Sequence, residues 1–177
     1  VANLAKMLHR ILCEDIVLQL SSVGDVPPVH ADAGMIEQVL MNLAVNARDA
    51  MPAGGRLTIS VAPLRVGEEY IRRHAEARLG NFVCLGVTDT GSGIAPEVLP
   101  HIFEPFFTTK DIGKGTGLGL ATVYGIVAQH QGWIEVSSRV GEGTTFKIVL
   151  PATAWPVEKA DEAEGGLKVR GGSETIL

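Results

Sequence analysis

Two rhythms of apolar and polar positions divide this chain of 177 residues into predicted strands and helices. Apolar side chains alternate with other residues at 14–21 and 57–61, and such alternation is typical of half-buried strands. Apolar runs at 82–89, 133–138 and 145–150 predict three more strands, the first of them buried. The pattern therefore predicts five strands along the chain.

Residues 33–51 carry the clearest helical spacing, because apolar side chains recur there every three or four residues. Asp32 stands where a capping side chain would accept a hydrogen bond from the first turn. The same spacing predicts two shorter helices, at 2–12 and 118–131.

Three connecting segments lack a strong core rhythm. Residues 65–80 are charged, and we expect them on the surface with a helical turn around Tyr70. Residues 96–102 are expected to form one short helix, since Pro96 suits its first turn. Residues 103–116 combine glycine, proline and lysine without periodicity, which predicts a mobile lid.

A polar stripe runs along the predicted helix 33–51, roughly a quarter turn from its apolar face. Its members are Asn42, Asn46 and Asp49. Asn is a poor helix former, so two of them in mid-helix carry a local cost that function would explain. A cleft-lining role and a pair of solvated amides both remain compatible with this pattern alone.

The predicted strand 82–89 leads into the sequence Asp-Thr-Gly-Ser-Gly-Ile at 89–94. Glycine permits turns at positive φ and lets a flat ligand approach the backbone. We therefore expect Asp89 on the rim of a cleft with a bare backbone floor. An ordinary turn is the alternative, because aspartate and glycine are common turn residues.

Alternating glycines at 113–119 run directly into the predicted helix 118–131. The free N–H groups and the positive dipole end of a helix start favour an anion. Lys110 and Lys114 add positive charge just upstream. The spacing differs from the Walker pattern, and a flexible hinge is the alternative to a phosphate site.

Composition narrows the class of protein. A net charge of −5 gives no support to binding of nucleic acid or anionic membranes. No run of eighteen apolar residues and no signal peptide is found in the sequence. Cys13 and Cys84 match no metal spacing, so we expect two buried, reduced thiols and a cytoplasmic protein.

Together these stretches supply groups for a base, for phosphates and for a metal ion. An ionised Asp89 only accepts hydrogen bonds, and the exocyclic amino group of adenine donates them. Guanine carries a carbonyl oxygen at that position, so we expect the site to prefer ATP to GTP. Mg²⁺ takes oxygen ligands, which Asn46 and the phosphates can provide.

The order of these motifs resembles the catalytic, ATP-binding domain of bacterial sensor histidine kinases. Residues 42–50 resemble the N box of that family, 89–94 its first glycine box, 103–110 its F box and 113–121 its second glycine box. The resemblance covers residues 10 to 151. It extends to a superfamily that also holds gyrase-type, mismatch-repair and chaperone ATPases, called GHKL.

The resemblance implies a Bergerat-type fold, an α/β two-layer sandwich with helices on one face of a mixed, mostly antiparallel sheet. It also implies roles for single residues. Asn46 is the expected Mg²⁺ ligand, and Asn42, Asn46 and Lys110 are the expected catalytic residues. The residues expected to bind the nucleotide are Asn42, Asn46, Asp49, Asp89, Gly91, Gly93, Ile94, Lys110, Lys114, Gly115, Thr116, Gly117, Leu118, Gly119 and Thr145.

Asn42 bears on the type of reaction. Hydrolytic members of the superfamily carry a glutamate at this position, and that glutamate activates water. Asparagine cannot take a proton, so the resemblance favours phosphoryl transfer, which needs positioning and charge neutralisation. The expected acceptor is a histidine on a separate helical dimerisation hairpin of the same parent protein.

None of the five histidines is followed by the acidic residue typical of that acceptor. We therefore expect the hairpin to precede residue 1 in a longer parent protein. Residues 152–177 have linker composition, and 171–177 resemble the opening of a response-regulator receiver domain, which suggests a hybrid kinase. The parent protein could be membrane-tethered, while no direct membrane contact is expected for this domain.

Two alternatives stay open at this point. One is a regulatory module of the same fold that senses ATP or ADP without transferring phosphate. The other is an anti-sigma-type serine kinase, although the phenylalanines of the F box favour the histidine kinases.

Overall fold

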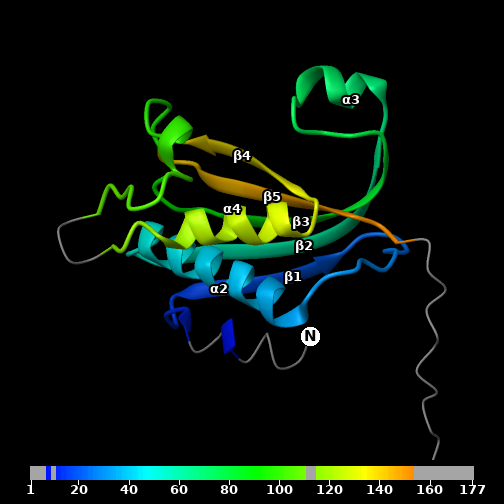
Figure 1. The fold of residues 1–177 in the computed structure, drawn as a ribbon. Helices are drawn as coiled ribbons and strands as arrows, with labels where there is room; N and C mark the ends of the chain where they lie inside the picture. Colours follow the sequence, from blue (N-terminus) through cyan, green and yellow to red (C-terminus); the bar gives the residue numbers. More distant parts are fainter. Residues whose placement is uncertain (1–6, 9–10, 111–114, 154–177) are drawn as a thin grey trace, which may run out of the picture.

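The computed structural model describes residues 7–8, 11–110 and 115–153. The strands of this part form one sheet in the order β1-β2-β3-β5-β4, with β1 parallel to β2 and the other neighbours antiparallel. Figure 1 shows α2 and α4 side by side across one face of the sheet. This arrangement confirms the predicted two-layer fold with a mixed, mostly antiparallel sheet. The bounds are β1 Ile16–Ser22, α2 Ala33–Ala50, β2 Gly55–Val66, α3 Glu68–Arg73, β3 Gly80–Asp89, α4 Gly119–Gln129, β4 Trp133–Arg139 and β5 Gly143–Pro151.

The main core lies between the sheet and the helix pair α2 and α4. Asp32 caps α2, because its Oδ1 accepts a hydrogen bond from the Met35 N–H at 2.9 Å. Leu43 on α2, Leu57 on β2 and Ile148 on β5 are fully buried in this layer. The apolar stripe of α2 is therefore held against the sheet, and its polar stripe is left at the side.

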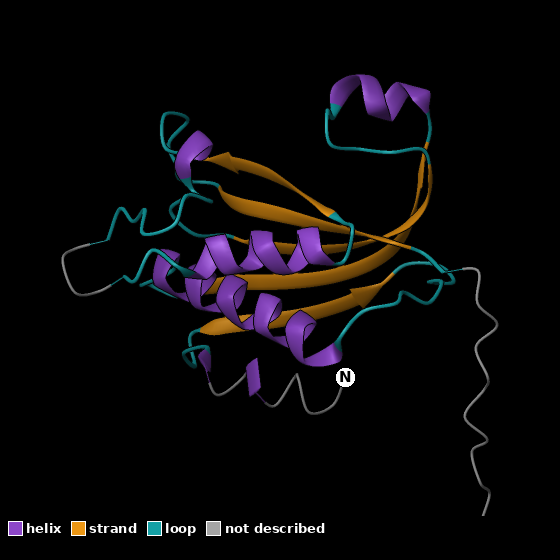
Figure 2. Cartoon of the chain, viewed as in Figure 1, coloured by secondary structure: helices purple, strands orange, loops and turns teal. Residues whose placement is uncertain are grey.

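A second, smaller core lies on the other face of the sheet, under the segment that carries α3. Phe82 and Trp133 meet edge to face there, with their ring centroids 4.7 Å apart. The Tyr70 hydroxyl donates to Glu135 Oε1 at 2.5 Å, which attaches α3 to β4. Figure 2 shows α3 standing apart from α2 and α4.

The structure changes several local expectations. The helix predicted at 96–102 is wrong: only a single turn of 3-10 helix forms, at Leu99–His101. Pro100 has no N–H, so it cannot continue an α-helical hydrogen-bond ladder. The expectation of two buried thiols is also wrong, because Cys13 is exposed and Cys84 is only half-buried. The helical turn expected near Tyr70 is confirmed as α3.

The predicted helix at 2–12 falls mostly outside the described residues, although residues 7, 8 and 11 are helical. No helix in the part of the chain that the structure describes has the length and apolar character needed to cross a membrane.

Candidate functional site

A cleft of about 570 Å³ opens beside α2 and gathers residues from all four sequence motifs. Its volume falls in the usual range for small-molecule sites. The predicted site residues that line it are Asn42, Asn46, Asp49, Asp89, Gly93, Ile94, Lys110, Gly115, Thr116, Gly117 and Gly119. Segments that lie far apart in the sequence, from Asn42 to Phe146, therefore meet in one site.

Asp89 is the buried carboxylate of this cleft. It ends β3, is 6% exposed, and accepts hydrogen bonds on Oδ1 from the N–H groups of Gly91 at 2.8 Å and Thr144 at 3.3 Å. Burial raises the pKa of the Asp89 carboxyl, and the two backbone hydrogen bonds act in the opposite direction. Both bonds end on Oδ1, so Oδ2 is the oxygen that can accept a hydrogen bond from a ligand.

The glycines of the first glycine box serve close packing. Gly93 has φ +70°, and a Cβ there would lie 2.0 Å from the carbonyl oxygen of Arg139. A Cβ on Gly91 would lie 2.7 Å from the carbonyl oxygen of Ala50. The loop is thus pressed between the end of α2 and the β4–β5 turn. Gly93 lines the cleft and Gly91 does not, so of these two glycines only Gly93 can contribute to the expected backbone floor.

The polar stripe of α2 faces the cleft. Asn42, Asn46 and Asp49 all line it, and Asn42 also lies beside Gly119 at the start of α4. Asn42 and Asn46 are half-buried, whereas Asp49 is exposed. The interpretation of this stripe as cleft-lining therefore describes its position correctly.

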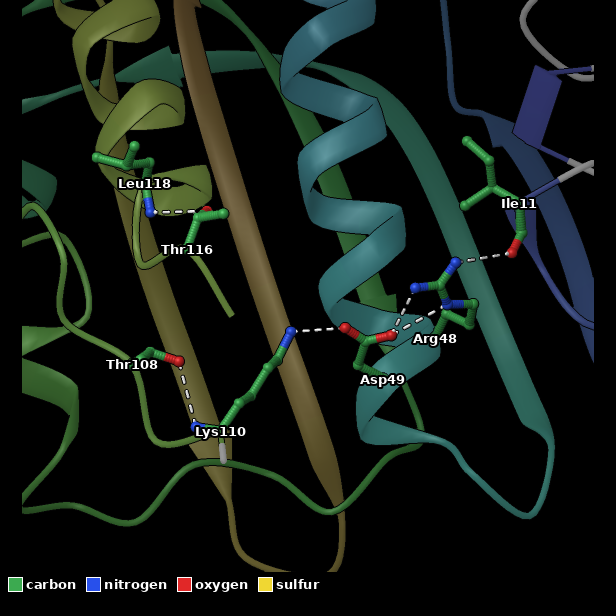
Figure 3. Close-up of polar contacts among 7 residues, drawn as sticks. All are labelled: Ile11, Arg48, Asp49, Thr108, Lys110, Thr116 and Leu118. Carbon is green, nitrogen blue, oxygen red and sulfur yellow. Dashed lines mark hydrogen bonds and ion pairs between the residues drawn. The ribbon is translucent and has the colours of Figure 1, made fainter. Parts of the chain in front are cut away.

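Asp49 carries two cationic partners, as Figure 3 shows. Lys110 Nζ lies 2.6 Å from Asp49 Oδ2, and Arg48 Nη2 lies 2.7 Å from Asp49 Oδ1. Arg48 Nη1 also donates to the Ile11 carbonyl at 3.4 Å. Partial burial raises the pKa of Asp49, but the hydrogen bonds and charges of Lys110 and Arg48 outweigh it, and the net pKa is lowered. Asp49 is therefore a charged acceptor at the cleft.

The second glycine box is held against the F box. Gly117 has φ +64°, and a Cβ there would lie 2.3 Å from the carbonyl carbon of Phe106. The Phe106 N–H also donates to the Gly117 carbonyl at 2.9 Å. Leu118 follows, 41% exposed, and does not line the cleft, although its N–H donates to Thr116 Oγ1 at 3.3 Å (Figure 3). Lys114 lies outside the described residues.

The structure places Thr145, one of the predicted contacts, outside the cleft. Thr145 lies on the face of β5 away from α2 and α4, where its hydroxyl bonds that of Thr88 at 3.0 Å. Thr144 lies on the other face, is 5% exposed, and lines the cleft. Alternation with buried Phe146 and Ile148 could have identified Thr144, because successive residues of a strand point to opposite faces. The structure therefore brings Thr144 to the cleft and leaves Thr145 outside it.

The sequence interpretation also missed several other residues of the cleft wall. They come mainly from α2, the F box and the segment between β3 and the F box, and they include apolar side chains that no motif marks. The set is Val45, Ala47, Arg48, Ala50, Ser92, Val98, Ile102, Phe107, Thr108, Thr109, Leu120 and Phe146.

No group of three or more His, Cys, Asp or Glu side chains suited to a metal ion occurs among the described residues. The cleft instead offers the amide groups of Asn42 and Asn46. Mg²⁺ usually keeps several waters and takes few protein ligands when phosphate oxygens are present. These residues therefore fit Mg²⁺ bound together with a polyphosphate.

The model of the family described as histidine kinase-, DNA gyrase B- and HSP90-like ATPases matches residues 31–154. The sensor kinase CckA of Brucella abortus is 45% identical over 184 residues, which cover 99% of this chain and 19% of that protein. The sensor histidine kinase ZraS of Escherichia coli K12 is 39% identical over 77% of this chain and 26% of that protein. The chain thus spans about a fifth to a quarter of these relatives.

Solved structures agree with this assignment. Full-length ShkA in complex with AMPPNP has a TM-score of 0.68 at 30% identity, covering 86% of this chain and 29% of that one. The catalytic domain of histidine kinase ThkA has a TM-score of 0.62 at 28% identity, covering 86% of this chain and 87% of that one. The chain therefore belongs to the histidine kinase-, DNA gyrase B- and HSP90-like ATPase family, and it is similar to the catalytic domains of sensor histidine kinases.

Proposed function

We propose that this domain binds Mg²⁺-ATP and transfers the γ-phosphoryl group to a histidine on a helical hairpin of its parent protein. The observation that carries the proposal is the cleft itself. It combines the buried carboxylate of Asp89, whose Oδ2 remains available, with the amides of Asn42 and Asn46 and the cation of Lys110. A base, a metal ion and phosphates need these three kinds of group.

The adenine base is assigned to Asp89. Its ionised Oδ2 would accept a hydrogen bond from the exocyclic amino group, with Ile94 packing nearby. Thr144, which lines the cleft, takes the place of Thr145 as the residue that contacts adenine through water. Gly91 supports this end of the site by close packing against α2.

The phosphates are assigned to the start of α4, to Lys110 and to the asparagines of α2. Backbone N–H groups at Gly117 and Gly119 lie at the start of α4, where the helix dipole favours an anion. Lys110 would exchange Asp49 for a phosphate oxygen. Bound Mg²⁺ would neutralise phosphate charge, and Asn46, with Asn42 in support, would hold it. Gly115, Thr116, Leu118 and Lys114 remain predicted contacts of this part.

Phosphoryl transfer is favoured over hydrolysis by Asn42. This side chain lines the cleft four residues before Asn46, where it can hold a ligand but cannot remove a proton from water. The domain would therefore orient the γ-phosphoryl group for attack by a nucleophile from another domain. The named sensor histidine kinases among the relatives favour histidine over serine as that nucleophile.

We propose that residues 1–151 form the catalytic domain and that 152–177 form a linker. The match with the Brucella sensor kinase covers 99% of this chain, and so includes most of this segment. A receiver domain after the linker would accept phosphate from the histidine in a hybrid kinase. Because ATP and such partners occur in the cytoplasm, the domain is assigned to that compartment.

A labelled-phosphate experiment tests the proposal. The chain is incubated with Mg²⁺ and γ-labelled ATP, with and without a separately produced histidine-bearing hairpin, and both free phosphate and acid-labile label are measured. Label on the hairpin with little free phosphate supports the kinase assignment. Rapid release of phosphate without the hairpin contradicts it, and nucleotide binding with neither product indicates a sensing module.

The Asn46→Ala variant sharpens this experiment. Loss of the amide oxygen should abolish Mg²⁺-dependent label transfer. Gln38→Ala, on an exposed position of the same helix, is a matched control that should transfer normally. Equal transfer by Asn46→Ala and wild type would contradict the role given to Asn46.

A further inference from the structure

Ser138 on β4 joins the two loops that enclose the purine end of the cleft. Its Oγ accepts a hydrogen bond from the Ile94 N–H at 2.8 Å, which holds the first glycine box. The same oxygen lies 3.0 Å from the Gly143 carbonyl oxygen and 2.9 Å from Thr144 Oγ1. Ser138 does not line the nucleotide cleft itself, so its influence acts through these neighbours.

The direction of these hydrogen bonds follows from the atoms involved. A hydroxyl has one hydrogen and two lone pairs, and a carbonyl oxygen can only accept. The Ser138 hydrogen must therefore point to the Gly143 carbonyl. Since that hydrogen is used, Thr144 must donate in the bond between the two hydroxyls. Ser138 Oγ then accepts from Ile94 and Thr144 and donates once, which fills its capacity.

This arrangement fixes what Thr144 offers to the cleft. Its only hydroxyl hydrogen points toward Ser138, so the lone pairs of Oγ1 are what a ligand or a bridging water meets. The Thr144 N–H is bound to Asp89 Oδ1 at 3.3 Å, beside an Asp89 Oδ2 that also accepts. The purine end therefore presents two neighbouring acceptors and no hydroxyl donor from Thr144.

We propose that Ser138 is a positioning residue for purine selectivity, because it takes up the Thr144 hydroxyl hydrogen and makes Thr144 an acceptor toward the base. An amino group at the purine 6-position, with two hydrogens, matches two acceptors directly or through water. Guanine has a carbonyl oxygen at that position, and this oxygen would be repelled by the two acceptors, Asp89 Oδ2 and Thr144 Oγ1. This inference rests on the ATP binding proposed above.

The test is the ratio of ATP to GTP affinity, measured by equilibrium titration of the intact chain. In Ser138→Ala the Thr144 hydroxyl can rotate and donate to the guanine carbonyl. The preference for ATP should then fall roughly three- to tenfold, the size of one hydrogen-bond change. In a Thr144→Val background, Ser138→Ala should cause no further fall, because the hydroxyl through which it acts is missing.

An unchanged ratio in Ser138→Ala overturns the inference, and so does a fall that is undiminished in the Thr144→Val background. If Ser138→Ala does not fold, Ser138→Cys keeps the shape but accepts hydrogen bonds weakly, and the same fall is expected. Wild-type chain that binds neither nucleotide refutes the proposed function as well. If the wild-type chain binds ATP but the ratio of ATP to GTP affinity is unchanged in the variants, only the role of Ser138 is refuted.

Discussion

Lys110 reaches Asp49 across the cleft, with Nζ 2.6 Å from Oδ2, and so pairs the F box with α2 (Figure 3). The pair lies among the groups assigned to the phosphates, where a carboxylate would repel a polyphosphate unless cations neutralise it. Lys110 and Arg48 supply that neutralisation. When ATP binds, Lys110 would then break its ion pair with Asp49 and form one with a phosphate group of ATP.

Replacing Lys110 by methionine should weaken ATP binding about tenfold, because a charge-assisted hydrogen bond to phosphate is lost. Adenosine, which has no phosphate, should bind to the variant and to wild type equally. Titration calorimetry with both ligands measures the difference. Lys147→Met changes an exposed lysine on the other face of the sheet and serves as the control. If Lys110→Met loses affinity for ATP and for adenosine to the same extent, a contact between Lys110 and phosphate is contradicted.

The Lys110–Asp49 pair also has a pH dependence. Asp49 has a lowered pKa in the folded state, so the fold gains stability from its ionisation above the unfolded value near 3.8. That contribution is lost as the pH falls through the lowered folded pKa. Because both side chains are partly exposed, the effect is small. The free energies of unfolding of wild type and Asp49→Asn, measured by denaturation, should therefore differ slightly at pH 7 and become equal in strong acid. A difference that persists in strong acid would contradict a stabilising role of the Lys110–Asp49 pair.

Asp89 titrates in the opposite sense. Its raised pKa means that the folded state holds the proton to a higher pH than the unfolded chain does, so stability falls as the pH rises through the folded pKa. The proposed adenine contact needs the ionised form. ATP affinity should thus begin to fall, on acidification, above the ordinary value of 3.8.

Asp89→Asn tests that contact. An amide that keeps its oxygen on the Gly91 N–H would present an NH₂ group to the adenine amino group, and donor would meet donor. ATP affinity should fall at least about tenfold at pH 7, because a hydrogen bond to a charged group is worth more than a neutral one. Titrations from pH 5 to 8 should show a flat profile for the variant. If Asp89→Asn binds ATP with wild-type affinity, the proposed contact between Asp89 and adenine is contradicted.

The elements and the four motifs that meet in the cleft could be predicted from the sequence, since both depend on local patterns. Period-2 and period-3.6 spacing placed the strands and α2, and the polar stripe marked the side of α2 that faces the cleft. Contacts that depend on packing between distant segments could not be predicted this way. Gly91 illustrates this limit, because its close approach to Ala50 becomes visible only once β3 and α2 are placed together.

Thr145 illustrates a different limit. Two adjacent threonines in one strand carry the same chemistry, and only the face of the sheet distinguishes them. A shift of one residue reverses that face, so a residue chosen from a motif without regard to strand phase can lie on the face away from the cleft. The helix predicted at 96–102 is wrong for a related reason: Pro96 suits a helix start, but Pro100 has no N–H to continue the hydrogen-bond ladder.

Gly93→Ala should destabilise the domain more than an ordinary glycine substitution. The residue has φ +70°, which costs about 1–2 kcal/mol for an L side chain, and its Cβ would lie 2.0 Å from the backbone carbonyl of Arg139. Because backbone cannot move aside as a flexible side chain can, we expect a total loss above about 2 kcal/mol in urea denaturation. Gly125→Ala is the matched control, since a Cβ there, within α4, meets open space, and helix propensity predicts a gain of about 0.5–1 kcal/mol. Similar stabilities for the two variants would show that the first glycine box can move away from the β4–β5 turn without cost.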